Sequence, residues 1–240
     1  PVFAEMGSTN PVFILPAAMQ QRGQQIAEGL AGSVRLGVGQ FCTCPGVVVI
    51  LSDENTASFK DELRQSLCDE PVGTMLHKGI HGGYENAVDQ LSARNGVKVI
   101  ARGPAGDDVC GVGASLLQVD FKNFIADPAM QGEVFGPATL LVECHSLEEI
   151  NDVARALEGQ LTATVHATED EIAELSSLLH LLEDRVGRLV FNDFPTGVEV
   201  GESMQHGGPW PATTDSRWTS VGAAAIQRFL RPGYRRSASR

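Results

Sequence analysis

Short apolar runs alternate with amphipathic segments along most of the chain. The apolar runs, which have the length of β-strands, occupy residues 12–15, 47–52, 97–102, 139–144, 161–167 and 187–192. Apolar residues at helical spacing occupy residues 22–40, 54–70, 84–94, 147–157 and 169–185. Continuous apolar strands that alternate with amphipathic helices are typical of a mostly parallel sheet covered by helices on both faces. The pattern therefore predicts an α/β domain.

Two regions interrupt this alternation. Residues 112–121 predict an additional antiparallel strand beside residues 97–102. The sequence from residue 193 onward is rich in Gly, Pro and Thr and predicts an ordered loop. A final helix is predicted over residues 220–230, ahead of a basic end. Asp53 is the expected N-cap of the second helix.

Composition and charge exclude several classes of partner. Hydrophobic residues make up 42% of the chain, but no apolar run approaches the roughly 20 residues that cross a bilayer. The net charge of −12 would repel nucleic acid over most of the surface. The first residues do not read as a signal segment, and five cysteines are an odd, sparse set for a disulfide scaffold. We therefore predict a cytoplasmic protein that binds neither membranes nor nucleic acid.

The segment GQFCTCPG (39–46) places two of the five cysteines one residue apart, just ahead of an apolar strand. A closed zinc site needs about four ligands, and no second Cys or His pair with metal-ligand spacing accompanies Cys42 and Cys44. His77 and His81 have i, i+4 spacing, but the glycines around them argue against a stable helix. A disulfide across one intervening residue would be strained. We therefore predict no metal and no disulfide here, and a buried structural thiol remains the alternative to a reactive one.

Cys42 is the strongest candidate for a reactive thiol, whereas Cys68, Cys110 and Cys144 are interpreted as structural. Glycines and a proline surround Cys42, so its loop can present backbone N–H groups to a bound carbonyl. A thiolate in that position could attack the carbonyl carbon. Such a nucleophile requires a base, and Glu5 is the candidate because its apolar and glycine neighbours can provide a pocket that raises its pKa.

Three motifs together resemble the aldehyde dehydrogenase superfamily in their order and approximate spacing. They are EMGSTNP (5–11), GQFCTCPG (39–46) and GEVFGP (132–137). The later segment FNDFPTGVEVGESMQHGGPWPATTD (191–215) is similar to the branch that oxidises α-ketoglutarate semialdehyde (2,5-dioxopentanoate). The resemblance covers nearly the whole chain and corresponds to the second half of such an enzyme.

This resemblance implies that Cys42, rather than Cys44, is the nucleophile in the NAD- or NADP-dependent oxidation of an aldehyde to an acid. Its thiolate would form a thiohemiacetal, a hydride would leave to the nicotinamide, and water activated by Glu5 would hydrolyse the thioester. The backbone N–H of Cys42 would form part of the oxyanion hole. The choice between NAD and NADP is not readable, because the family's cofactor-binding domain is expected before Pro1.

The resemblance also assigns residues to two subsites. Glu133 matches the residue that holds the nicotinamide ribose, and Phe135 and Gly7 match positions beside the cofactor. Positions near the aldehyde tunnel are matched by Phe41, Phe194, Gln205 and His206. Gly7 could equally serve only a turn, Phe135 could be a core residue, and Asn192 could be a strand-end cap.

The resemblance further implies a division of the chain. Residues 1–209 would form the catalytic domain, and residues 210–240 would form a C-terminal helix and tail that packs on the missing half or on an oligomer partner. The expected partners are an aldehyde substrate, the N-terminal cofactor-binding half and further copies in a homo-oligomer. Two alternatives stay open: a cofactor-independent thiol esterase, which needs only Cys42 and an oxyanion donor, and a non-catalytic module that keeps the fold for oligomer contacts.

Overall fold

A seven-stranded sheet forms the centre of the protein in a computed structural model that describes residues 2–197 and 200–234. The strand order is β4-β6-β7-β2-β1-β8-β9, and neighbours are parallel except for β4, which is antiparallel to β6. The strands are β1 (Val12–Ile14), β2 (Val47–Leu51), β4 (Lys98–Arg102), β6 (Ser115–Asp120), β7 (Ala138–Cys144), β8 (Gln160–His166) and β9 (Val186–Phe191). Two short strands, β3 (Gly73–Thr74) and β5 (Gly111–Val112), pair separately. The predicted mostly parallel sheet is confirmed, and residues 112–121 do pair antiparallel with residues 97–102. The strand that runs against the rest of the sheet, however, is the edge strand β4, because β6 is parallel to β7.

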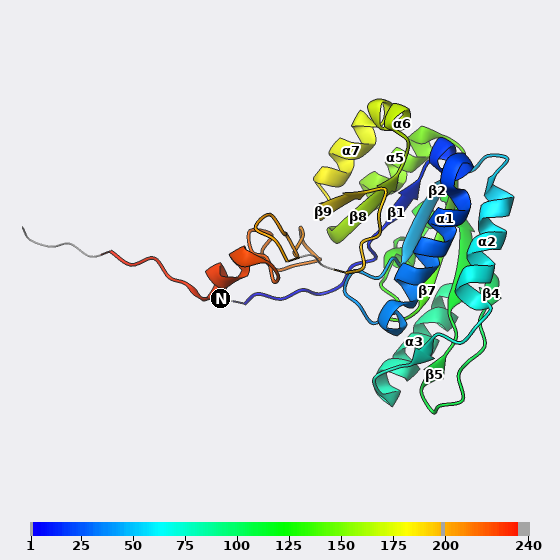
Figure 1. Ribbon diagram of the computed structural model, residues 1–240, viewed down its shortest axis with the longest axis horizontal. Helices are drawn as coiled ribbons and strands as arrows, with labels where there is room; N and C mark the ends of the chain where they lie inside the picture. Colours follow the sequence, from blue (N-terminus) through cyan, green and yellow to red (C-terminus); the bar gives the residue numbers. More distant parts are fainter. Residues whose placement is uncertain (1, 198–199, 235–240) are drawn as a thin grey trace, which may run out of the picture.

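Helices cover both faces of this sheet (Figure 1). The α-helices are α1 (Pro16–Arg35), α2 (Thr56–Cys68), α3 (Lys78–Ser92), α4 (Phe121–Ala126), α5 (Leu147–Ala156), α6 (Glu169–Glu174) and α7 (Ser176–Glu183). The 3-10 helices are η1 (Leu36–Gly39), η2 (Pro128–Gln131) and η3 (Ala223–Phe229). Side chains of β1 alternate between the faces: Val12 and Ile14 pack with α1 and α2, whereas Phe13 packs with α5 and α7. The predicted α/β architecture is therefore correct.

Several element ends differ from the sequence-based expectation. The first helix begins at Pro16 rather than residue 22, because the fixed φ of proline suits the first helical turn. It ends at Arg35, after which Gly37 and Val38 adopt left-handed backbone angles. Asp53 does not cap the second helix; its carboxylate instead accepts a hydrogen bond of 2.8 Å from the backbone N–H of Asn55, which precedes that helix.

Three other expectations about helices are wrong. The glycine-rich stretch after His77 is helical as part of α3, because the His77 ring caps the helix by accepting the backbone N–H groups of Gly79 and Ile80. The helix predicted over residues 169–185 is divided into α6 and α7. The final helix is the short 3-10 helix η3.

Residues near the two ends of the chain lie together, beside the α/β body (Figure 1). The backbone N–H of Met6 donates to Ala212 O at 2.9 Å, and that of Thr214 donates to Ala4 O at 3.0 Å. The ring of Phe3 packs edge to face on Trp218. The boundary expected at residue 209 and the packing of the C-terminal segment on a partner stay predictions. Within the described part of the chain, every helix is too short or too polar to cross a bilayer.

Candidate active site

The candidate site lies where the amino ends of the central strands meet. Residues 5–10 lead into β1, the loop that contains Cys42 leads into β2, and the loop that contains Glu133 leads into β7. Parallel neighbours bring these three loops to one edge of the sheet. The loop of residues 206–208 joins them, because Gly208 packs against the backbone of Gln160 at the start of β8.

Asn10 fastens the Cys42 loop to the sheet. Its side-chain amide donates to Cys42 O at 2.9 Å and to Cys44 O at 3.0 Å, and its amide oxygen accepts from Ser8 and Thr162. The residue is fully buried and has a φ of 45°, a left-handed angle that asparagine tolerates better than most residues. Sequence reasoning missed this role, although Asn10 stands in the quoted motif EMGSTNP.

A close contact between Gly39 and Gly136 also holds the Cys42 loop in place. A Cβ on Gly39 would lie 2.2 Å from the carbonyl carbon of Gly136, which joins the Cys42 loop to the loop ahead of β7. Gly39 also has a φ of +66°. Glycine is therefore required at position 39 for the contact between these two loops. The sequence-based expectation had given the glycines of this loop only the task of exposing backbone N–H groups.

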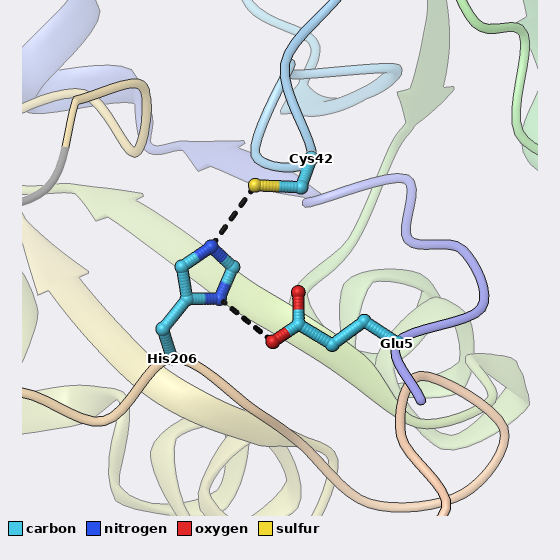
Figure 2. Close-up of side chains that lie close together, drawn as sticks. All are labelled: Glu5, Cys42 and His206. Carbon is cyan, nitrogen blue, oxygen red and sulfur yellow. Dashed lines mark hydrogen bonds and ion pairs between the residues drawn. The ribbon is translucent and has the colours of Figure 1, made fainter. Parts of the chain in front are cut away.

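Cys42, His206 and Glu5 converge from three separate segments (Figure 2). The Cys42 Sγ lies 2.9 Å from His206 Nε2, and His206 Nδ1 lies 3.8 Å from Glu5 Oε1. Cys42 is exposed, Glu5 is half-buried and His206 is buried. A thiol next to an imidazole, with a carboxylate behind the imidazole, is the arrangement that activates nucleophilic cysteines.

The electrostatics of the three groups favour a neutral thiol and a neutral imidazole at rest. Partial burial and the Glu5 carboxylate raise the pKa of Cys42, although backbone N–H groups of Cys42 and Thr43 lower it. Burial lowers the pKa of His206, and Glu5 opposes that change. A neutral imidazole can accept the thiol proton, and the carboxylate can then stabilise the imidazolium.

Three of the other thiols are buried and inert. Burial raises the pKa of Cys44 to about 12, that of Cys68 to about 11 and that of Cys144 to about 12. Thiols that remain protonated at neutral pH are poor nucleophiles. The structural interpretation of Cys68 and Cys144 agrees with this burial, and Cys44 belongs with them; Cys110 is half-buried.

The donor atoms of Glu5, Cys42 and His206 lie within 4.8 Å of one another, close enough to hold a metal ion. A closed structural zinc site needs a fourth ligand, whereas catalytic zinc sites use three protein ligands and keep one position open. The other histidine candidate, His77, caps α3 instead. The expected absence of a metal at Cys42 therefore stays a prediction, as do the roles of these three side chains.

Glu133 lines two neighbouring cavities. A cavity of about 210 Å³ is lined by Met6, Gly7, Ser8, Thr9, Gln131, Gly132, Glu133, Glu158, Gly159, Gln160 and Pro211. A smaller hollow is lined in part by Phe41, Glu133 and Phe135. A side chain at Gly7 would begin 3.2 Å from Glu133 Oε2, so glycine gives that carboxylate its room. The structure thus brings Gly7, Phe41, Glu133 and Phe135 together, while their roles stay predictions.

The other residues predicted to contact the substrate lie in different places. Phe194 packs on Gly29 of α1 and on the His166 ring, at a centroid distance of 5.0 Å, and belongs to the core cluster under α1. Gln205 lines a third cavity, and its side chain donates to Ser216 O. His206 was predicted near the aldehyde; its contact with the Cys42 sulfur was not foreseen, since the two are separated by more than half of the chain.

Known proteins similar to this chain identify its family. The aldehyde dehydrogenase family profile matches residues 1–229. The chain is 47% identical over 97% of its length to α-ketoglutaric semialdehyde dehydrogenase 2 of Azospirillum brasilense, and 40% identical over 97% to the α-ketoglutaric semialdehyde dehydrogenase of Acinetobacter baylyi. It spans 44% of the length of each of these relatives.

Solved structures show the same fold at low sequence identity. Proline utilization A of Bdellovibrio bacteriovorus matches 95% of this chain over 23% of its own, with a TM-score of 0.78 and 21% identity. An NAD⁺ complex of betaine aldehyde dehydrogenase from Staphylococcus aureus matches 94% of this chain over 44% of its own, with a TM-score of 0.75 and 16% identity. The family profile, the relatives and the fold together establish that this chain belongs to the aldehyde dehydrogenase family.

Proposed function

We propose that this chain supplies the nucleophile and the bases of an NAD(P)-dependent aldehyde dehydrogenase that oxidises α-ketoglutaric semialdehyde. The observation that carries the proposal is the 2.9 Å approach of Cys42 Sγ to His206 Nε2, with Glu5 behind the imidazole. The substrate follows from the two relatives with that activity in their names, at 47% and 40% identity.

The first step is attack on the aldehyde. His206 Nε2 accepts the proton of the Cys42 thiol, and Sγ forms a bond to the carbonyl carbon while the π electrons move onto oxygen. The backbone N–H groups of Cys42 and Thr43 favour the charged form of the sulfur, because they oppose the rise in its pKa. They can therefore stabilise the negative oxygen of the thiohemiacetal that forms beside it.

The residues around Glu133 fit a nicotinamide cofactor. Gln131 Oε1 is buried without a hydrogen-bond partner in the described residues, and both Gln131 and Glu133 line the 210 Å³ cavity. Burial raises the pKa of Glu133, which the backbone N–H of Ser8 opposes. Two oxygen acceptors at one cavity suit ribose hydroxyl donors. When bound, the cofactor accepts the hydride that leaves the thiohemiacetal carbon.

The last step is hydrolysis of the thioester. Glu5 removes a proton from water, the water oxygen bonds to the acyl carbon, and the C–S bond breaks with its electrons returning to Cys42 Sγ. Glu5 is suited to this because its Oε1 is buried without a hydrogen-bond partner in the part of the chain that the structure describes. The same carboxylate, 3.8 Å from His206 Nδ1, stabilises the imidazolium that forms during attack, so its two roles fall in different steps.

The cofactor-independent thiol esterase remains the second candidate. The contact between Cys42 and His206 requires no cofactor, so it supports ester hydrolysis as directly as aldehyde oxidation. A non-catalytic oligomerisation module would leave the arrangement of Glu5, Cys42 and His206 unexplained.

The proposal includes the partners of the chain. An N-terminal half would supply the rest of the cofactor cleft, because the chain spans 44% of the length of its relatives. We also propose that the enzyme is a cytoplasmic homo-oligomer, an expectation supported by its five free thiols and by its exposed apolar side chains.

The test uses the polypeptide that carries this chain in its natural reading frame. Reduction of NAD and NADP is measured with α-ketoglutaric semialdehyde, and hydrolysis of p-nitrophenyl acetate is measured without cofactor, for wild type and Cys42→Ser. Loss of both activities in Cys42→Ser is expected. Ester hydrolysis without cofactor reduction in wild type would favour the esterase, and absence of both would favour the module.

A further inference from the structure

Arg188 is a cation placed beside the nucleophile by a tight backbone contact. It lies on β9, one residue after Gly187, where a Cβ would come within 1.8 Å of Gly207 O. This contact sets the start of β9 directly against the residue that follows His206. Burial lowers the pKa of Arg188, and the negative charges of Asp193 and of Cys42 as a thiolate oppose that change.

The guanidinium borders a cavity large enough for a small organic acid. The cavity has a volume of about 380 Å³ and is lined by Gly187, Arg188, Gly201, Ser203, Met204 and Gln205. Residues 203–205 directly precede His206 in the chain, so this cavity and the site of Cys42 share one loop. Its volume falls in the ordinary range of ligand pockets, about 300–1,000 Å³.

The hydrogen-bonding capacity of Arg188 is only partly used. Nη2 donates to Pro195 O at 2.7 Å, while Nη1 meets only the weakly accepting Met204 Sδ at 3.9 Å. Nε is buried and has no partner, and no carboxylate pairs with Arg188 among residues 2–197 and 200–234. The Asp193 carboxylate acts on Arg188 from beyond ion-pair distance. A partly buried guanidinium without a directly paired anion costs free energy that a bound carboxylate would recover.

We propose that Arg188 is the specificity residue that binds the carboxylate of the substrate while its aldehyde carbon faces Cys42. This inference rests on the proposed function, because it explains why the enzyme would prefer an aldehyde acid to an uncharged aldehyde. The guanidinium offers N–H donors in a planar fork, which matches the two oxygens of a carboxylate.

Arg228 is the rival cation near this site. It also acts on the His206 imidazole, and its guanidinium lies 5.5 Å from the centre of the Phe3 ring. Arg228 does not line the 380 Å³ cavity. It therefore provides a matched control in which the same charge is removed close to His206 but outside the cavity.

The first experiment alkylates Cys42 in the polypeptide that carries this chain, and it needs neither cofactor nor turnover. The ratio of rate constants for iodoacetate, which is anionic, and iodoacetamide, which is neutral, is measured by peptide mapping for wild type, Arg188→Gln, Arg188→Lys and Arg228→Gln. We expect Arg188→Gln to lower the ratio about 10-fold or more, since a charge-assisted contact is lost. The rate constant for iodoacetamide in Arg188→Gln should stay within about 3-fold of the wild-type value. Arg188→Lys, which keeps the charge, should restore part of the ratio.

Three outcomes would overturn the proposal. An unchanged ratio in Arg188→Gln would show that the guanidinium does not attract the anion. An equal decrease for both reagents would assign Arg188 a structural role through Pro195. A decrease in Arg228→Gln as large as that in Arg188→Gln would remove the assignment from Arg188.

The second experiment separates this proposal from the proposed function. The ratio of kcat/KM for α-ketoglutaric semialdehyde to kcat/KM for pentanal is expected to fall about 10- to 100-fold in Arg188→Gln. Most of this change should come from a lower kcat/KM for the semialdehyde, which carries the carboxylate. A wild type that alkylates preferentially with iodoacetate but oxidises no aldehyde would contradict the dehydrogenase and leave the anion site supported. A wild type that oxidises both aldehydes, with a ratio unaffected by Arg188→Gln, would contradict the anion site alone.

Discussion

At the scale of single residues, the proposed chemistry depends on how Cys42 loses its proton. Partial burial and Glu5 raise its pKa, so few molecules carry a thiolate at neutral pH. His206 provides a proton acceptor at 2.9 Å, and its own lowered pKa keeps it neutral and able to accept. The imidazole therefore compensates for a thiol that its surroundings make less acidic.

Replacing His206 with Gln should slow alkylation of Cys42 by iodoacetamide at pH 7 roughly 100-fold, within the range of a lost general base. The measurement is a time course of labelling with peptide mapping. His180→Gln, a change of an exposed histidine, is the control and should react like wild type. Equal labelling rates in His206→Gln and wild type would remove the imidazole from the activation of Cys42.

Replacing Glu5 with Gln should stop the reaction after hydride transfer in the polypeptide that carries this chain. The acyl group would stay on Cys42 because water is no longer activated. Rapid mixing with the semialdehyde should give one equivalent of reduced cofactor per site, followed by a much slower steady phase. A steady rate equal to that of wild type would contradict this role.

At the scale of elements, the loop that carries Cys42 is held by the segment ahead of β1 and by the loop ahead of β7. The Asn10 side chain bonds the carbonyls of Cys42 and Cys44, and Gly39 touches the backbone of Gly136. Ligands in open α/β sheets usually bind at the carboxyl ends of the strands. This site lies at the amino ends, so its loops require anchors of their own.

Asn10→Asp should lower the free energy of unfolding by about 3 kcal/mol, because it replaces the amide donor with a charged oxygen that faces carbonyl oxygens. Urea unfolding measures this change. Asn95→Asp is the matched control, since Asn95 is exposed and bonds Asn123 at the surface. A loss of stability in Asn10→Asp no larger than that in Asn95→Asp would show that the Asn10 contacts do not hold the loop.

The end of β8 should make stability depend on pH. His166 is 1% exposed, and burial lowers its pKa to about 4. Between that value and the unfolded value of about 6.5, the unfolded chain binds a proton that the folded chain does not, so stability falls as the pH falls.

The predicted contribution of His166 is about 2 kcal/mol between pH 7 and pH 5. Urea unfolding of wild type and His166→Leu at the two values measures it, and the variant should lose less stability on acidification by about that amount. His180→Gln serves again as the surface control. Parallel pH profiles for wild type and His166→Leu would contradict the prediction.

At the scale of the whole molecule, four apolar side chains from segments that also carry residues of the site are exposed. Met6, Leu36, Phe41 and Phe135 are exposed by 45%, 49%, 40% and 39%. Such residues mark surfaces that contact another protein or domain. In the proposed enzyme, the N-terminal half would cover them.

Residues 1–240 expressed alone should therefore self-associate and should not reduce NAD or NADP with short semialdehydes. The loss of one oxyanion donor alone can lower kcat about 100-fold, and the cofactor cleft would also be incomplete. Size-exclusion chromatography and a cofactor-reduction assay test this. Cofactor-dependent turnover by a monodisperse preparation of these residues would contradict the proposed division of labour between two halves.

The sequence by itself determined the architecture and named all three converging residues as candidates, but not the contact between His206 and Cys42. Apolar strands buried on both faces must alternate with amphipathic helices, so the sheet could be predicted from the residue pattern of β1, β2, β7 and β8. The same local information did not distinguish a helix after His77 from a loop, because a single side-chain cap decided it. It did single out Cys42 and Glu5, through the motifs that contain them.

Only the tertiary structure decided which distant groups meet. His206 reaches Cys42 because its loop returns to the amino ends of β8 and β9, and no spacing in the sequence encodes that return. Phe194 packs under α1 because Gly29 has no side chain and so leaves room for the Phe194 ring. The carbonyls that Asn10 binds lie more than 30 residues away along the chain. Hydrophobic periodicity specifies which face of an element is buried, whereas the meeting of polar side chains depends on how the strands are ordered in the sheet.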